Sequence, residues 1–184
     1  MDIDSGELFR RYFPFVSHFV MRMGVNAHDV DDLAQEVFLI AHRKGGYVAG
    51  AASPKTWLAR TALGVVSTHK RSLRRRREDA YSDVGVATAA GDASPADVTE
   101  SREALARVQR ALDKLDFDQR AVFVLYEFSR QSCEEIATAL EVPVGTVYSR
   151  LHTARSAFLE AHRRLLLAET RPPAHERAAI GGRP

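Results

Sequence analysis

The side chains best suited to bind another molecule gather in the stretch EEIATALEVPVGTVYSRLHTAR, residues 134–155. When Leu151 is directed inward, steps of 100° per residue place short polar side chains on the opposite face of one helix. This outer face carries Ser149, His152, Thr153 and Ser156, with Arg150 and Arg155 on the flanks. Short polar groups can reach base edges in a major groove, and arginines can contact phosphates. The pattern therefore predicts the recognition helix of a helix-turn-helix.

A short helix and a turn precede this helix. Ser132 and Glu135 fit an S-x-x-E capping box, in which each side chain satisfies a backbone N–H group at a helix start. Pro143 has no N–H donor and disfavours helix at Val142, so the short helix must end there. The alternative is a three- or four-helix bundle whose last helix is exposed on one side, because turns with Gly and Pro are common between helices.

A second candidate surface lies in DVDDLAQEVFLIAHRK, residues 29–44. Helical spacing gives this stretch an apolar face made of Val30, Leu33, Val37 and Ile40. The opposite face carries Asp31, Gln35, Phe38 and His42, with Leu39 near its edge. An aromatic side chain on the polar side of a helix is unusual. Either Phe38 packs beneath a neighbouring helix of its own domain, or it is the apolar anchor of a partner surface.

Basic residues are concentrated at the end of a third stretch, SPKTWLARTALGVVSTHKRSLRRRR, residues 53–77. Ser53 can cap a helix there, and Pro54 suits its first turn. Six of the eight positions from 70 to 77 are basic, namely Lys70, Arg71 and Arg74 to Arg77. Such a cluster attracts phosphates without sequence preference, and it is equally typical of a solvent-exposed face that has no ligand.

The elements that position these residues fall into two groups. Residues 1–77 and 101–167 carry helical patterns, whereas residues 78–100 are acidic, rich in Ala, Gly, Ser and Asp, and without a basic residue. The sequence predicts an all-α protein with two small helical domains joined by a flexible linker, followed by a disordered tail at 168–184. Because the acidic linker adjoins the basic cluster, electrostatic attraction favours a compact free form at low salt.

Apolar spacing also predicts the core of the second domain. The first stripe consists of Leu105, Val108, Leu112 and Leu115. Asp118 is placed to cap the next helix, whose inner face contains Val122, Leu125 and Tyr126. The β-rich run AVFVLYEF at 121–128 is interpreted as helix because helical periodicity flanks it on both sides.

Composition excludes several classes of protein. The chain has 184 residues, 45% hydrophobic and 27% charged, as expected for soluble globular domains, and a net charge of only +2. Cys133 is the only cysteine, so neither an intrachain disulfide nor a cysteine-rich zinc site can form. We find no catalytic or phosphate-binding motif, and we expect no enzyme, no metal and no cofactor. The chain shows neither a signal peptide nor a membrane-spanning run, which predicts a cytoplasmic protein.

The stretch SCEEIATALEVPVGTVYSRLHTAR resembles the region 4 signature of bacterial sigma factors of the extracytoplasmic-function group. That signature has a Ser, then E-I-A, then P-x-G-T-V-x-S-R-L and A-R. DDLAQEVFLIAHR is similar to the region 2.2 helix of the same family, whose pattern is D-L-x-Q-E-x-F. The departures are Asp116 where Pro is usual, Glu141 where Gly is frequent, and Gly64 and Thr68 where the family has Asn and Asp. On both signatures, in the family's order, the chain is identified as a member of this group.

The resemblance implies a protein that directs the RNA polymerase core to promoters, in a stress or envelope-type response. Contact with the clamp helices of β′ would involve Asp31, Asp32, Gln35, Glu36, Phe38 and Leu39, and region 4 would meet the β flap. The opened minus-10 strand would be held by Tyr47, Trp57, Arg60, Lys70, Arg71, Arg74 and Arg75. The minus-35 duplex would be contacted by Thr146, Tyr148, Ser149, Arg150, His152, Thr153 and Arg155. Whether an anti-sigma factor binds is left open.

Two other functions fit part of the sequence. A two-domain helix-turn-helix regulator that does not join polymerase explains residues 101–167, but it gives no reason for Phe38 or for the element at 53–77. A protein-interaction module of a stress pathway would bind a partner through its helices and DNA only incidentally. Co-purification with polymerase core tests the first alternative, and filter binding to duplex DNA tests the second.

Overall fold

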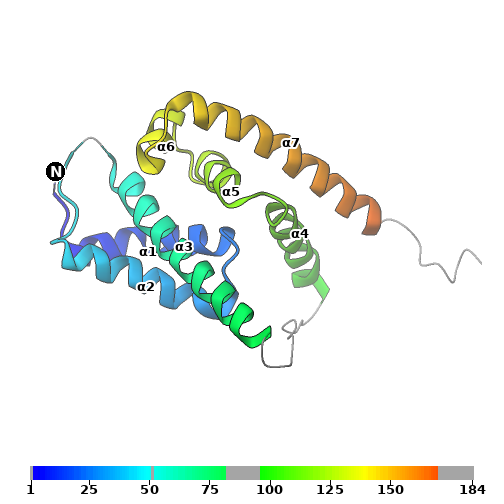
Figure 1. Ribbon diagram of the computed structural model, residues 1–184, viewed down its shortest axis with the longest axis horizontal. Coiled ribbons are helices and arrows are strands. Elements are labelled where there is room, and N and C mark those ends of the chain that lie inside the picture. The colour runs from blue at the N-terminus through cyan, green and yellow to red at the C-terminus, as the bar shows by residue number, and fades with distance from the viewer. Residues whose placement is uncertain (1, 51, 82–95, 170–184) are drawn as a thin grey trace, which may run out of the picture.

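The helices form two groups that pack against each other. The computed structural model describes residues 2–50, 52–81 and 96–169. Its elements are α1 (Ser5–Arg22), α2 (Ala27–Arg43), α3 (Pro54–Tyr81), α4 (Ala96–Leu112), α5 (Phe117–Phe123), the π-helix η1 (Val124–Phe128), α6 (Cys133–Leu140) and α7 (Val144–Glu169). Figure 1 shows α1 to α3 on one side and α4 to α7 on the other. The prediction of an all-α protein with two small helical domains is confirmed.

Side-chain caps start α1 and α3 of the first domain, whereas Asn26 before α2 makes no capping hydrogen bond. The Asp4 carboxylate accepts hydrogen bonds from the backbone N–H groups of Glu7 (3.0 Å) and Gly6 (2.7 Å), which lower the pKa of Asp4 below its usual value. The predicted cap at Ser53 is confirmed, because its Oγ accepts a hydrogen bond from the N–H of Thr56 at 3.2 Å. Each cap satisfies a backbone donor that has no partner within its own helix.

The core of the first domain follows the apolar spacing of its helices. Val30, Leu33 and Val37 are buried on α2, as the sequence predicts. They meet the buried faces of α1, with Leu8, Val16 and Phe19, and of α3, with Leu58, Ala62 and Val66. Burial of one such large apolar side chain stabilises the fold by about 1.5–3 kcal/mol. The three helices therefore hold the loops and exposed faces of this domain in fixed positions.

Two sequence predictions for the second domain are wrong. Asp116, and not Asp118, caps α5, since its Oδ1 accepts a hydrogen bond from the N–H of Gln119 at 2.8 Å. Asp118 already lies inside the helix, where a side chain cannot take the capping position. Leu105 is exposed and does not join the core. Among the described side chains of α4, only Ala111 and Leu112 are fully buried.

The run at 121–128 is helical as predicted, but it widens into a π-helix after Phe123. The N–H of Ser129 donates to the carbonyl of Val124 at 3.1 Å, one residue further back than in an α-helix. All five residues from Ala121 to Leu125 are buried. They are enclosed on several sides, because η1 packs against α1 of the first domain as well as against α6.

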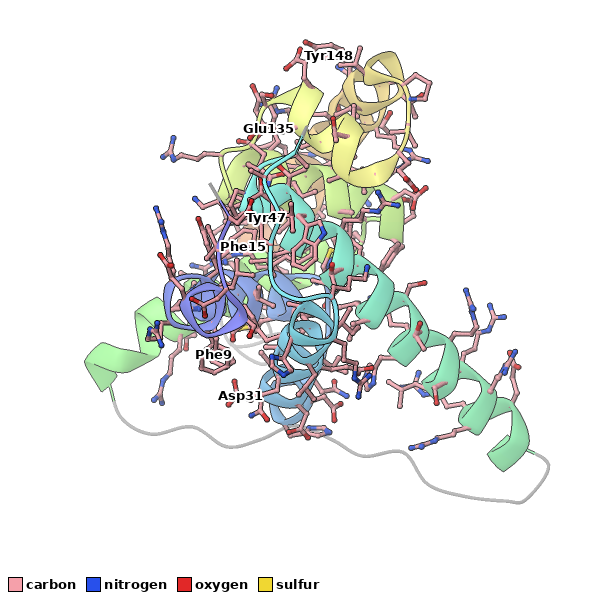
Figure 2. All side chains as sticks on the ribbon, turned by 90° about the vertical axis from the view of Figure 1, so that its left-hand side faces the viewer. Phe9, Phe15, Asp31, Tyr47, Glu135 and Tyr148 are labelled. Atoms are coloured by element: carbon pink, nitrogen blue, oxygen red, sulfur yellow. The ribbon has the colours of Figure 1, made fainter. Side chains whose placement is uncertain are left out.

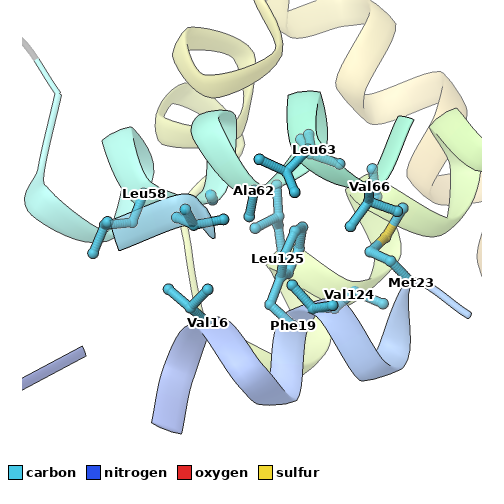
Figure 3. Packing of buried hydrophobic residues seen from close by; sticks show 14 of the residues in the cluster. Val16, Phe19, Met23, Leu58, Ala62, Leu63, Val66, Val124 and Leu125 are labelled. Atoms are coloured by element: carbon cyan, nitrogen blue, oxygen red, sulfur yellow. The ribbon is translucent and has the colours of Figure 1, made fainter. Parts of the chain in front are cut away.

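The two domains share one hydrophobic core. In Figure 3, Val124 and Leu125 of η1 lie beside Phe19 of α1 and beside α3 residues that include Leu63 and Val66. Helices α3 and α6 also pack together. The two domains are therefore in contact among the described residues, largely through apolar side chains, while the predicted attraction of the linker involves mainly residues 82–95, which the structure does not describe.

The linker and tail predictions fall mainly outside the described residues. Helix α3 continues to Tyr81 and α4 begins at Ala96, so helical structure enters the range 78–100 from both ends. The range 82–95 and the predicted tail beyond Glu169 lie outside the residues that the structure describes.

Candidate nucleic-acid interface and partner surface

Helix α7 presents the polar face that its sequence predicts. Val147, Leu151 and Ala154 are buried against the rest of the second domain. The side chains of Ser149, His152, Thr153 and Ser156 are exposed on the opposite side. The predicted capping box before α6 is also confirmed, with both hydrogen bonds between Ser132 and Glu135 present. This short, well-capped helix braces the start of α7, as a helix-turn-helix requires.

The hydroxyl groups on this face are oriented by their own helix. Ser149 Oγ donates to the carbonyl of Thr146 at 3.0 Å, and Thr153 Oγ1 donates to the carbonyl of Ser149 at 3.1 Å. Each hydroxyl has a single proton, so both oxygens remain available only as acceptors. They are therefore suited to accept hydrogen bonds from the exocyclic amino groups of adenine or cytosine.

The arginines on the flanks of α7 are held by carboxylates. Arg150 Nη2 lies 2.6 Å from Asp118 Oδ2, and Arg155 Nε donates to Glu127 Oε1 at 2.7 Å. The hydrogen bond that Arg155 donates to the Glu127 carboxylate raises the pKa of Arg155, and the guanidinium also lies 4.8 Å from the centre of the Tyr126 ring. Both arginines are thus fixed in direction, and a DNA phosphate would have to replace their carboxylate partners.

Two further candidates lie near the start of α7. Tyr148 is exposed, and Thr146 is half-buried. The Glu134 carboxylate and then Cys133 raise the pKa of Tyr148, so its hydroxyl stays protonated and can donate a hydrogen bond. In the turn before α7, Glu141 takes a left-handed conformation with φ of 55°, which is the reason a glycine is favoured at such a position.

Of the two alternatives for Phe38, packing beneath a neighbouring helix of its own domain is confirmed, and its expected outward position as a partner anchor is wrong. Its side chain is only 5% exposed, because Phe9 and Phe13 of α1 cover it, with the Phe9 ring edge-on at 5.2 Å. The exposed apolar groups are instead Phe9 (42%) and Leu39 (55%). Together they border an open hollow of about 340 Å³ with Phe38 in its lining. Phe9 escaped the sequence analysis, although its i, i+4 spacing from Phe13 was a signal for an aromatic pair.

Acidic and amide groups lie along the exposed side of α2, and Gln35 is the one of them that lines the hollow. The side chains of Asp31, Asp32, Gln35 and Glu36 are all exposed, as the sequence predicts. Figure 2 shows Phe9 and Asp31 at one end of the molecule and Tyr148 of α7 at the other. We call the surface made by Phe9, Leu39 and these four polar residues the α1–α2 surface. Its chemistry suits a basic partner with an apolar side chain to insert.

Tyr47, which the resemblance places among the residues that hold the opened minus-10 strand, is not accessible. Its ring is 7% exposed and lies edge-on to Trp57, and its hydroxyl donates to the carbonyl of Ala52 at 2.6 Å. A two-way backbone pairing between Ile3 and Tyr47 covers it. Gly46 allows this approach, because a Cβ there would lie 2.5 Å from the Ile3 carbonyl. Sequence spacing could not reveal that the N-terminal segment folds over this loop.

The other minus-10 candidates lie on α3 and form two groups. Some are accessible to a DNA strand, and the others contact the second domain. Arg71, Arg74 and Arg75 are exposed, and Trp57 is half-buried. Arg60 forms an ion pair with Glu141 of the second domain, with 2.6 Å between nitrogen and oxygen. Burial, followed by the nearby charge of Arg120, lowers the pKa of Lys70, whose ammonium lies 5.8 Å from the Phe117 ring centre. Two of the predicted DNA-contacting groups are thus engaged by the second domain.

The described part of the chain lacks two other kinds of site. No group of three or more His, Cys, Asp or Glu side chains there could hold a metal ion. Within the same residues, no helix combines the length and apolar character needed to cross a membrane.

Two family matches cover these surfaces. Residues 8–76 match the family described as Sigma-70 region 2, and residues 105–158 match the family described as Sigma-70, region 4. The first match includes the α1–α2 surface and most of α3, and the second includes the helix-turn-helix.

Curated relatives match over most of their length. The RNA polymerase sigma-H factor of Pseudomonas aeruginosa is 35% identical over 156 residues, which cover 80% of each chain. The ECF RNA polymerase sigma-E factor of Escherichia coli is 34% identical, again over 80% of each chain. The ECF RNA polymerase sigma factor SigW of Bacillus subtilis is 32% identical, over 74% of this chain and 76% of SigW.

Solved structures share the fold. The sigma factor RpoE of Bartonella quintana, determined with the anti-sigma factor NepR, superposes with a TM-score of 0.67 at 22% identity over 84% of this chain and 94% of RpoE. CnrH, determined with the cytosolic domain of CnrY, gives a TM-score of 0.62 at 25% identity over 90% of this chain and 89% of CnrH.

Proposed function

The chain belongs to the extracytoplasmic-function sigma factors, and we propose that its three exposed surfaces divide the work of promoter recognition among them. As a sigma factor it directs the RNA polymerase core to specific promoters for transcription initiation. In the proposed division, the α1–α2 surface binds polymerase, α3 holds the opened minus-10 strand, and α7 contacts the minus-35 duplex. We assign its promoters to a stress or envelope-type response, in keeping with the group.

The α1–α2 surface is the observation that carries the proposal. A regulator that only binds DNA has no need for exposed Phe9 and Leu39 beside four exposed polar groups on the same end of the molecule. Exposed acidic side chains on α2, the helix that borders the apolar hollow, complement a basic helical partner such as the clamp helices of β′. Asp31, Asp32 and Glu36 would steer the encounter, and the apolar side chains would supply most of the binding free energy.

Helix α7 would enter the major groove with its polar face. Ser149 and Thr153 offer acceptors for base amino groups, and His152 can donate or accept according to its protonation. Thr146 and Tyr148 lie in the first turns of α7, the end of the helix that would enter the major groove first. Arg150 and Arg155 would contact the phosphates on either side of the groove. The exposed side chains of Tyr148, Ser149, His152, Thr153 and Arg155 support this arrangement.

Helix α3 would hold the opened strand by charge and stacking. Arg71, Arg74 and Arg75 are exposed and can follow a phosphate backbone. Trp57 has a half-buried ring with the Lys44 ammonium 6.0 Å from its centre, so a base could stack there beside a cation. Tyr47 would contribute only indirectly, by fixing the loop before α3.

The partners and setting follow from this role. We propose that the protein acts in the cytoplasm with the polymerase core, including the β flap, and with promoter DNA, and that it catalyses no reaction of its own. An anti-sigma factor is a further candidate partner. The structure of CnrH with the cytosolic domain of CnrY, at 25% identity, supports a protein partner of this kind.

Run-off transcription tests the proposal. Purified protein is added to polymerase core with a pool of genomic fragments, and core alone serves as the control. We expect discrete transcripts whose start sites share upstream elements. Binding to the same fragments without co-purification with core and without transcripts would instead establish the two-domain regulator.

A further inference from the structure

The segment before α1 is bonded to the loop that precedes α3. The backbone N–H of Ile3 donates to the carbonyl of Tyr47 at 2.9 Å, and the N–H of Tyr47 donates to the carbonyl of Ile3 at 2.8 Å. Further along the loop, Asp2 Oδ1 accepts a hydrogen bond from the N–H of Ala49 at 2.8 Å. In Figure 1 the segment at the N label runs beside this loop. We call Asp2 and Ile3 the strap.

The strap is fixed by the residues that follow it. The Asp4 carboxylate caps α1, and Ser5 Oγ lies 2.9 Å from His42 Nδ1 of α2. Ile3 is only 7% exposed and belongs to the hydrophobic core. Residues 2–5 are thus all bonded to other parts of the first domain, and the strap gives the loop a fixed support.

The loop has few means of ordering itself. Three of the six residues from 45 to 50 are glycine, and glycine loses more conformational entropy on ordering than any other residue. The side chain of Val48 is 68% exposed, so its burial does not fix the loop. The hydrogen bonds that join Tyr47 and Ala49 to the strap therefore order the loop from outside.

Tyr47 connects the strap to the start of α3. Its hydroxyl donates to the carbonyl of Ala52 at 2.6 Å, and its ring lies edge-on to Trp57 with 6.2 Å between the ring centres. The Trp57 ring is half-buried, with the Lys44 ammonium 6.0 Å from its centre. The position of this ring thus depends on Tyr47, and the position of Tyr47 depends on the strap.

We propose that Asp2 and Ile3 are positioning residues for recognition of the minus-10 element. The strap holds the loop and the Trp57 ring in the arrangement that receives an unpaired base of the opened strand. The inference rests on the proposed function and adds to it a segment that precedes residue 8, where the match to Sigma-70 region 2 begins. A loop that is ordered beforehand loses less conformational entropy when it binds, so the strap strengthens binding without touching DNA.

Transcription from two templates tests the role of Asp2. Polymerase core with the protein bound is given a promoter recovered from the genomic pool and the same promoter with an altered minus-10 element. D2A removes the acceptor of the Ala49 N–H, so the ratio of the two transcripts should fall roughly three- to tenfold. D2N is the matched control, because it loses the same charge but keeps an oxygen that can accept the hydrogen bond. Its ratio should equal that of wild type.

The ratio separates positioning from folding. Loss of folded protein would lower both transcripts equally and leave their ratio unchanged. A D2A ratio equal to that of wild type would overturn the inference, and so would an equal fall in D2N, since charge alone would then be responsible. If wild type gives no transcripts with core, the proposed function fails and this inference with it, whereas an unchanged D2A ratio removes only the strap.

Two neighbouring glycines provide a second matched pair. Gly45 and Gly46 both have positive φ, +79° and +93°, which side chains rarely adopt. A Cβ at Gly46 would lie 2.5 Å from the carbonyl oxygen of Ile3, whereas a Cβ at Gly45 would meet nothing within 4 Å. G46A should therefore displace the strap and lower the transcript ratio, and G45A should not. An equal fall in G45A would show that backbone strain in the loop is sufficient and would overturn the role of the strap.

Discussion

At the scale of single residues, the arginines of α7 are positioned before any DNA is present. Arg155 is hydrogen-bonded to Glu127 and lies over Tyr126, which fixes the direction of its guanidinium. Exposed ion pairs of this kind contribute only about 0–1 kcal/mol to stability. A DNA phosphate can therefore replace Glu127 as the partner of Arg155 at a small cost in free energy. Until it does, the Glu127 carboxylate weakens the attraction of Arg155 for DNA of any sequence.

Removal of that carboxylate should strengthen nonspecific binding. In E127Q, Arg155 is released to pair with a phosphate, so affinity for random duplex DNA should rise. The log–log salt dependence should steepen by about 0.9 for one added phosphate contact. Fluorescence anisotropy over a range of salt concentrations measures both. E169Q is the control, because it makes the same charge change at the far end of α7; an equal effect there would show that net charge alone is responsible.

His152 should determine sequence preference. Its side chain is exposed on the polar face of α7, without an ion pair among the described residues. H152A should lose one base contact and weaken binding to the preferred minus-35 sequence by about 1–3 kcal/mol, with little change on random DNA. Binding-site selection followed by affinity measurement checks this. An unchanged preferred sequence would argue that α7 does not read bases through this face.

At the scale of elements, the pairing of α1 with α2 creates a surface that neither helix has alone. Phe13 and Phe9 cover Phe38, and the aromatic cluster then supports Leu39 at the surface. The buried and exposed members should behave differently when truncated. A side chain in the aromatic core acts on folding, whereas an exposed one acts on the partner.

Truncation of Phe38 and Leu39 should separate these roles. F38A should lower the free energy of unfolding by about 3–5 kcal/mol because a buried ring is lost. L39A should leave the melting temperature close to wild type but weaken binding to polymerase core by at least about 1 kcal/mol if Leu39 is an anchor. Circular dichroism and core pull-down titrations measure the two effects. L105A, which truncates an exposed leucine on α4, is the control; equal core binding by L39A and wild type would exclude the α1–α2 surface.

At the scale of the whole molecule, the two domains are coupled through η1. Leu125 is fully buried and belongs to the same cluster as Phe19 and Val66 of the first domain. Loss of its side chain should therefore affect both domains, although it belongs to the second. The single tryptophan, Trp57, lies in the first domain and reports on that domain separately.

L125A should shift the unfolding transition seen by Trp57. We expect a cost of about 2–5 kcal/mol for the buried leucine, part of which should appear as a lower urea midpoint in Trp57 fluorescence. L105A should leave that midpoint unchanged, since its side chain is exposed. If L125A alters helical circular dichroism but not the Trp57 midpoint, the domains are not coupled in solution.

The sequence alone determined the features that depend on neighbours along one helix. The capping box of Ser132 and Glu135, the buried stripe of Val147, Leu151 and Ala154, and the exposed acidic face of α2 were all predicted and are present. Helical geometry fixes these features within one or two turns. The family signatures lie on the same local patterns, so the family could be identified before the fold was known.

Only the tertiary structure decided what covers each side chain. Phe38 is buried by α1, Tyr47 by Ile3, and Arg155 is paired with Glu127, all across gaps in sequence that helical spacing does not constrain. The hydrogen bond from Arg120 to the carbonyl of Arg22 likewise joins residues 98 positions apart. Spacing gives the direction of a side chain on its helix, but burial and pairing depend on which other helix packs against it, and that is set by the summed contacts of the whole core.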